Sequence, residues 1–406
     1  MSPRFRSRAF DASRRTFLRL LAAAGGAAAA CRSGPEPLPS LLGAPIRPYG
    51  ERSPFVRAVR LLEPGRTPEQ ADSLTPLADL FGTITPSSLH FERHHSGVPA
   101  IDPAAHRLLV HGLVDRPLVF TMDDLKRLPS ISRVHFLECS GNSASGWRKT
   151  PQPTVQAAHG LTSCSEWTGV SLALLLEEVG VQPGAAWIVA EGADPAKMTR
   201  SIPLSKARDD ALLAYAQNGE PLRPEQGFPL RLLLPGWEGN TNVKWLRRLK
   251  LVDQPVMGRE ETSKYTDLMP DGRARQFTFV MEAKSVVTRP SGSQRLARGF
   301  HEITGLAWSG RGRIARVEIT TDAGATWKDA DLQEPVLPMA HTRFRLAWEW
   351  DGRDAVIASR ATDETGYRQP TRDELVAVRG LNSFYHNNMI QAWHVGSDGM
   401  VEYAVF

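Results

Sequence analysis

Two hydrophobic patterns divide the chain. From about residue 61 to 270, short apolar runs alternate with amphipathic segments, and the runs at 134–137 and 228–234 predict buried strands. Between these runs, residues 170–179 place leucines and valines on one face of a predicted helix. A mixture of short strands and helices of this kind predicts an α+β domain over residues 61–270.

Beyond about residue 280, apolar and polar residues alternate. Residues 316–321 alternate with a period of two, and an Asp-Ala-Gly turn and a return segment follow them, which predicts a hairpin. Residues 344–350 and 356–361 repeat the alternation. Strands of this length, separated by turns, predict an immunoglobulin-like β-sandwich over residues 280–406.

The first thirty residues are predicted to be an export signal and not part of the fold. Residues 13–18, Ser-Arg-Arg-Thr-Phe-Leu, form a twin-arginine sequence, and the small apolar residues after them are too few to span a bilayer. A basic amphipathic start is the alternative. We therefore expect a signal peptide over residues 1–30, an extended Pro- and Arg-rich arm over 31–60, no stable membrane span, and a periplasmic protein. The twin-arginine route carries folded proteins, which suggests a cofactor inserted before export.

The net charge gives no support for nucleic-acid binding. The formal charge is +5 at pH 7, but the leader holds six arginines and one aspartate, which account for the whole excess. The mature chain is therefore formally neutral, and we expect no nucleic-acid partner.

The chain contains three cysteines. Cys31 follows the leader, so it is either a lipid-modified first residue or lies near an ordinary cleavage site. Cys139 lies in the stretch HFLECSGN, where a buried strand runs into a turn, and Cys164 lies in a predicted turn before a helix. Two mature cysteines in an oxidising compartment are also consistent with a disulfide. From these features alone, Cys139 is a metal ligand, a small buried residue, or half of a disulfide.

Common catalytic motifs are absent, which leaves a thiol and several cations. Residues 90–94 resemble a zinc-protease motif, but the Glu is misplaced and the segment does not look helical. The chain has no phosphate loop, dinucleotide fingerprint or Cys-x-x-Cys-His haem sequence. A thiolate suits a soft metal. Arg93, Arg231 and Lys244 suit phosphate, with the backbone N–H groups of residues 242–243 beside the lysine.

Five separated stretches resemble the sulfite oxidase family of molybdopterin oxidoreductases. They are FERHH, HFLECSGN, SCSEWTGVSLALLLEEVG, QGFPLRLLLPGWEGNTNVKWLRRL and LAWSGRGRIARVEITTDAGATW. The resemblance covers about residues 74–406, and within the family it is greatest to the molybdenum subunits of the sulfite or sulfane dehydrogenases of bacterial thiosulfate oxidation. It implies a molybdenum–molybdopterin cofactor, a catalytic domain that binds it over residues 61–270, and a dimerisation domain over 280–406.

The resemblance also implies the residues of the site. Cys139 falls at the position whose thiolate binds molybdenum, Arg93 at one that faces the substrate, and Tyr265 at that of the active-site tyrosine near the metal. The cofactor-binding positions correspond to Phe91, Glu92, Arg93, His94, His95, Asp194, Gln226, Arg231, Asn242, Val243 and Lys244. Arg231 and the last three of these fall on the cofactor-phosphate site, and Gln226 replaces a histidine of the vertebrate sulfite oxidases.

One departure from the family pattern bears on the substrate. Sulfite oxidases carry a second substrate-binding arginine five places after the metal-binding cysteine, and here that position is Ala144. The pocket is therefore less positive, which makes a protein-bound sulfur a plausible substrate beside free sulfite. We predict a dehydrogenase that oxidises sulfite or carrier-bound sulfane sulfur.

The electrons need an acceptor outside this chain. Because the sequence shows no haem or cluster ligands, we expect a c-type cytochrome subunit as acceptor, bound to a homodimer of this chain within a heterotetramer. Two alternatives remain. One is a sulfoxide reductase of the same fold, and the other is a cofactor-free secreted binding protein in which Cys139 and Cys164 form a disulfide.

Overall fold

The computed structural model describes residues 45–406 except 64 and 66. The twin-arginine sequence and Cys31 lie outside the described residues. Residues 57–406 form one compact unit, and the described residues 45–56 lie outside it. Of the predicted arm, residues 45–60 contain neither helix nor strand. No helix in the described ranges is both long enough and apolar enough to cross a bilayer.

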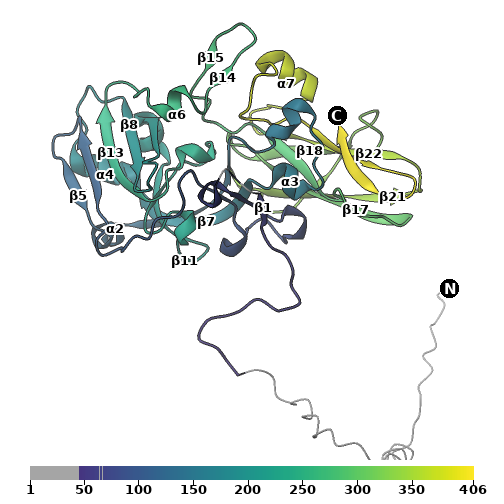
Figure 1. The fold of residues 1–406 in the computed structure, drawn as a ribbon, viewed down its shortest axis with the longest axis horizontal. Helices are drawn as coiled ribbons and strands as arrows, with labels where there is room; N and C mark the ends of the chain where they lie inside the picture. The colour runs from purple at the N-terminus through teal and green to yellow at the C-terminus, as the bar shows by residue number, and fades with distance from the viewer. Residues whose placement is uncertain (1–44, 64, 66) are drawn as a thin grey trace, which may run out of the picture. The chain divides into compact units, whose positions relative to one another are not determined.

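A mixed five-stranded sheet forms the first part of the larger unit (Figure 1). Its strand order is β5 (Leu118–Phe120), β4 (Leu108–Gly112), β13 (Leu246–Val252), β8 (Trp187–Gly192) and β9 (Thr199–Pro203). Neighbouring strands are antiparallel except β4 and β13, which are parallel. Buried residues of α2 (Met122–Arg127), α4 (Leu172–Val179) and α5 (Leu204–Asp209) complete its core. Helix α2 starts with a capping box, in which the Asp124 N–H donates to Thr121 Oγ1 at 3.1 Å.

A second sheet contains Cys164 and leads into Cys139. Its order is β11 (Glu220–Pro221), β10 (Leu212–Gln217), β7 (Thr162–Ser171) and β6 (Ser130–Glu138), with β12 (Arg231–Leu233) also paired to β10. The prediction of a turn around Cys164 is wrong, because this residue lies inside the ten-residue strand β7. Pairing on both sides, to β6 and β10, keeps the Ser- and Gly-containing segment extended. The predicted helix at 170–179 therefore begins two residues later, at Leu172.

The last third of the chain is the predicted β-sandwich. One sheet has the order β16 (Lys284–Arg289), β17 (Gly299–Trp308), β21 (Thr342–Trp350) and β20 (Asp331–Leu332). The other has the order β19 (Lys328–Asp329), β18 (Ile314–Thr320), β22 (Ala355–Asp363), β23 (Gln391–Val395) and β24 (Val401–Val405). Strands β18 and β19 are the predicted hairpin, with Ile319 opposite Lys328. Both sheets bury side chains in one core, including Ile303, Trp308 and Trp393, and the predicted fold class is confirmed.

Short elements connect these sheets. Strands β1 (Leu61–Glu63), β2 (Asp72–Leu74) and β3 (Glu92–Arg93) form a small sheet, and β14 (Asp267–Leu268) pairs with β15 (Ala274–Arg275). The remaining α-helices of the described part are α3 (Val155–His159), α6 (Arg259–Thr262) and α7 (Arg372–Arg379). Strand β3 and the loops that follow β6, β8, β12 and α6 bring together the side chains described next.

Candidate functional site

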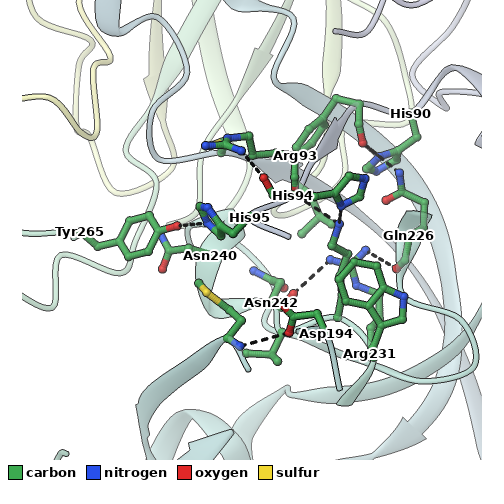
Figure 2. A pocket seen from close by; sticks show the side chains of 18 residues that line it. His90, Arg93, His94, His95, Asp194, Gln226, Arg231, Asn240, Asn242 and Tyr265 are labelled. Atoms are coloured by element: carbon green, nitrogen blue, oxygen red, sulfur yellow. Dashed lines mark hydrogen bonds between the residues drawn. The ribbon is translucent and has the colours of Figure 1, made fainter. Parts of the chain in front are cut away.

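A cavity of about 730 Å³, its open mouth included, gathers nearly all of the predicted site residues (Figure 2). The predicted residues that line it are Phe91, Arg93, His94, His95, Cys139, Asp194, Gln226, Arg231, Asn242, Val243, Lys244 and Tyr265. Glu92 does not line the cavity; its carboxylate pairs with Arg60 and lies 2.9 Å from His94 Nε2. Six further residues complete the lining: His90, Leu137, Met198, Gly239, Asn240 and Trp245.

The residues that sequence reasoning missed mostly neighbour those it found. His90 directly precedes the predicted segment 91–95, and Asn240 and Trp245 flank residues 242–244. Extending each predicted segment by one or two residues would have found these three. Met198 carries no such signal, since only the loop after β8 brings it to the cavity.

Cys139 stands directly after β6, at the exit from a buried strand. Its N–H donates to Leu161 O at 3.0 Å, and its carbonyl accepts from Asn142 N at 2.9 Å, so the turn is fixed at both ends. Burial raises the pKa of the Cys139 thiol to about 11, so a metal that binds it must displace a proton. Cys139 and Cys164 are both free thiols, and the disulfide alternative is not present.

A buried arginine and a half-buried lysine line the other part of the cavity. Arg231 is 3% exposed and donates to Gln226 O at 3.0 Å and Asn242 O at 3.3 Å, while its Nε has no partner among the described residues. Lys244 Nζ bonds to His94 Nδ1 at 2.7 Å and Glu225 O at 3.0 Å. Burial lowers the pKa of Arg231 to about 9, and burial with the nearby guanidinium lowers that of Lys244 to about 7. Two cations that are shielded from water and bonded to neutral acceptors are suited to a bound anion.

The turn before Lys244 corrects one expectation. The backbone N–H groups at 242–243 were expected to be available to phosphate, but Asn242 N donates to Gly239 O and Val243 N to Thr241 O, each at 3.1 Å. Both N–H groups are therefore occupied at the end of the 3₁₀ turn Gly239–Thr241. The Asn242 side chain is also engaged, since its Oδ1 accepts from Leu234 N at 2.6 Å. These residues therefore shape the loop, and the cations remain the anion-binding groups.

Arg93, in strand β3, and Tyr265, in the loop after α6, approach the cavity from different segments (Figure 2). Arg93 Nε lies 2.9 Å from Asp72 Oδ1, which fixes the guanidinium at the cavity edge. The Tyr265 hydroxyl lies 2.9 Å from His95 Nε2, and the Arg200 guanidinium stacks 4.9 Å from the Tyr265 ring centre. Burial raises the pKa of Tyr265 well above its usual value, and burial with Arg93 lowers that of His95 to about 4. Near neutral pH the pair is thus a protonated phenol and a neutral imidazole.

Asp194 and Gln226 are held by the surrounding chain. Asp194 accepts hydrogen bonds from Met198 N at 3.1 Å and from Ser96 Oγ at 3.2 Å, and Gln226 Nε2 donates to Phe91 O at 2.9 Å. Both side chains nevertheless line the cavity. Ala144 is not part of the lining; it begins the 3₁₀ turn Ala144–Arg148 that follows the Cys139 loop.

The pKa of Lys244 predicts a pH dependence of the stability of cofactor-free protein. Its pKa is about 7 in the folded chain and near 10.5 when unfolded, so between these values the unfolded chain binds more protons and stability rises with pH. We expect the free energy of unfolding of the wild type, relative to a Lys244→Met variant, to be constant below that window and to increase through it. Urea titrations of both proteins measure this difference, and parallel pH profiles would contradict it.

Two family profiles match consecutive parts of the chain. The oxidoreductase molybdopterin binding domain matches residues 95–260, and the Mo-co oxidoreductase dimerisation domain matches residues 275–393. A crystal structure of the sulfane dehydrogenase SoxCD from Paracoccus pantotrophus is 45% identical, with a TM-score of 0.84, and covers 92% of this chain and 100% of that chain.

Individual relatives include sulfite oxidases and nitrate reductases. The sulfite oxidase of Gallus gallus is 32% identical over 78% of this chain and 73% of that protein. The mitochondrial sulfite oxidase of Drosophila melanogaster is 32% identical over 76% of this chain, and the nitrate reductase of Hordeum vulgare is 32% identical over 76% of it. The match spans 59% of the length of the fly protein and 39% of the barley protein.

Proposed function

The chain belongs to the sulfite oxidase family of molybdopterin oxidoreductases, and we propose that it oxidises a sulfur substrate, either sulfite or a sulfane sulfur carried on a protein. Molybdenum–molybdopterin is its cofactor. The 45% identity to a sulfane dehydrogenase, over the whole of that chain, supports a sulfur substrate. The nitrate reductase is as similar to this chain as the sulfite oxidase is. Sequence identity to these relatives alone therefore does not decide whether the chain oxidises or reduces its substrate.

One observation carries the proposal: a single thiol, a buried arginine and a half-buried lysine share one cavity. The thiol of Cys139 would bind the metal, and Arg231 and Lys244 would hold the anionic phosphate of the cofactor. The unpartnered Nε of Arg231 and its neutral neighbours fit such an anion. When bound, the cofactor supplies oxygen-atom transfer to sulfur with a two-electron change at the metal.

The chain itself would bind and orient the substrate. Arg93, fixed by Asp72, would hold an anionic oxygen of the substrate and stabilise the charge that develops during transfer. Tyr265 keeps its proton at neutral pH because of burial, so it would donate a hydrogen bond at the reacting centre. His95, held neutral, would orient that hydroxyl through their 2.9 Å hydrogen bond.

The partners follow from the same proposal. Two electrons per turnover would leave to a c-type cytochrome subunit, and the dimerisation domain at 275–393 would pair two copies of this chain within a heterotetramer. The twin-arginine sequence supports a periplasmic location. Neither alternative, a sulfoxide reductase or a cofactor-free binding protein, is favoured by a specific contact in the cavity.

Substrate-dependent reduction of a c-type cytochrome tests the proposal. We expect purified protein to contain molybdenum and to reduce the cytochrome with sulfite or with a sulfane on a peptide cysteine. We expect Ala144→Arg to raise kcat/KM for free sulfite about tenfold, because one charge-assisted hydrogen bond contributes about 1.5 kcal/mol. Protein that lacks molybdenum, or that only reduces methionine sulfoxide with a reduced dye, would refute the proposal. An unchanged sulfite rate in Ala144→Arg would show that pocket charge does not set specificity.

A further inference from the structure

A buried ion pair lies directly behind Cys139. Glu138 is the last residue of β6, and Lys284 is the first residue of β16 in the sandwich; their charged atoms are 2.8 Å apart. Each side chain is 1% exposed. The pair therefore joins the strand that presents the thiol to the β-sandwich, with no access to solvent.

Further hydrogen bonds connect the sandwich to the loop that contains Cys139. Trp308 Nε1, at the end of β17, donates to Glu138 Oε2 at 2.7 Å. Lys284 Nζ also donates to Ser143 Oγ at 2.8 Å, at the far end of the Cys139 loop. Within the loop, Asn142 Nδ2 donates to Glu138 Oε1 at 2.9 Å. The carboxylate and the lysine thus hold both ends of residues 138–143.

The sandwich reaches this loop from a second segment as well. His386 N donates to Ser140 O at 2.8 Å, and Asn387 Nδ2 donates to Ser143 O at 2.9 Å. Both residues lie between α7 and β23. The loop is therefore fixed by directed hydrogen bonds from two parts of the sandwich.

Stability alone does not explain such a pair, because removing two charges from water offsets much of their attraction. A pair of this kind does fix geometry, since a carboxylate that accepts from three directions has little freedom. We propose that Lys284 and Trp308 are positioning residues, through which the β-sandwich holds the loop that presents the Cys139 thiol. The sandwich would thus set the geometry of the site in addition to pairing copies of the chain.

Alkylation of the thiol in cofactor-free full-length protein tests this without turnover. We expect Lys284→Gln and Trp308→Phe each to raise the rate at which iodoacetamide modifies Cys139 about tenfold, with buried Cys164 as internal reference. Arg360→Gln is the matched control, because it breaks another ion pair of the sandwich, with Glu318 at 2.8 Å. An unchanged Cys139 rate in folded variants, or an equal rise in Arg360→Gln, would overturn the proposal.

One double variant separates positioning from general destabilisation. Glu138→Gln with Lys284→Gln restores a neutral hydrogen-bonded pair, so we expect the Cys139 rate to return toward that of the wild type. If Lys284→Gln does not fold, Trp308→Phe still tests the proposal. It removes the indole N–H that donates to Glu138 and keeps an aromatic side chain in the core.

Cofactor-loaded protein provides an independent measurement. We expect the wavelength of the thiolate-to-molybdenum charge-transfer absorption band to shift in the Lys284 and Trp308 variants and not in the Arg360 control. The proposal rests on the proposed function, in which Cys139 is the metal ligand. The positioning role and the ligand assignment can nevertheless fail separately. The absorption band reports the ligand, whereas the alkylation rate reports the loop whether or not a metal binds.

Discussion

Replacing Cys139 with serine is expected to lower turnover about a thousandfold or more, which corresponds to about 4 kcal/mol in activation free energy. Among the residues that the structure describes, no other cysteine lines the cavity. A serine hydroxyl stays protonated at neutral pH, so it does not supply the soft, anionic sulfur ligand that a cysteine thiolate gives the metal. The backbone hydrogen bonds of residue 139, to Leu161 and Asn142, do not involve the sulfur, so the fold should persist. Steady-state kinetics and molybdenum content measure the effect.

Cys164→Ser is the matched control for this prediction. Cys164 is fully buried in β7, and its sulfur accepts only a long contact, 3.5 Å, from His341 N. We expect near wild-type turnover and a modest loss of melting temperature, because a buried thiol tolerates a hydroxyl poorly. Wild-type activity in Cys139→Ser, or lost activity in Cys164→Ser alone, would contradict the assignment of the ligand.

Replacing Arg231 with methionine is expected to weaken retention of the cofactor 10- to 100-fold. A charge-assisted hydrogen bond contributes about 1.5–3 kcal/mol. Arg231 lines the cavity, and its Nε has no hydrogen-bond partner among the described residues. Methionine keeps a long side chain and removes the charge. The measurement is the molybdenum content of protein purified under identical conditions, followed by the rate at which cofactor is lost on dilution.

Arg343→Met is the matched control for Arg231→Met. Arg343 also donates to two backbone carbonyls, Gly82 O at 2.9 Å and Leu80 O at 3.1 Å, but it does not line the cavity. We expect it to destabilise the fold without changing molybdenum content. Equal cofactor loss in both variants would mean that general destabilisation, and not the lost cation, releases the cofactor.

The sequence by itself determined the features that depend on local pattern. Period-two alternation over residues 316–321, followed by a turn and a return segment, is typical of a hairpin, so β18–β19 could be predicted. The apolar run at residues 134–137 predicted a buried strand that ends just before Cys139, and β6 ends there. Resemblance to the family then indicated the residues around the thiol, and all but Glu92 line the cavity.

Only the tertiary structure decided what depends on distant partners. Strand β7 forms where a turn was expected, because pairing with β6 and β10 outweighs its local preference. The donors at 242–243 are used inside their own turn, which no pattern of side chains records. Glu138 and Lys284 are 146 positions apart, and their pairing arises only when the sandwich packs behind the thiol. Local periodicity reports burial, whereas contacts between distant segments follow from how the buried faces pack together.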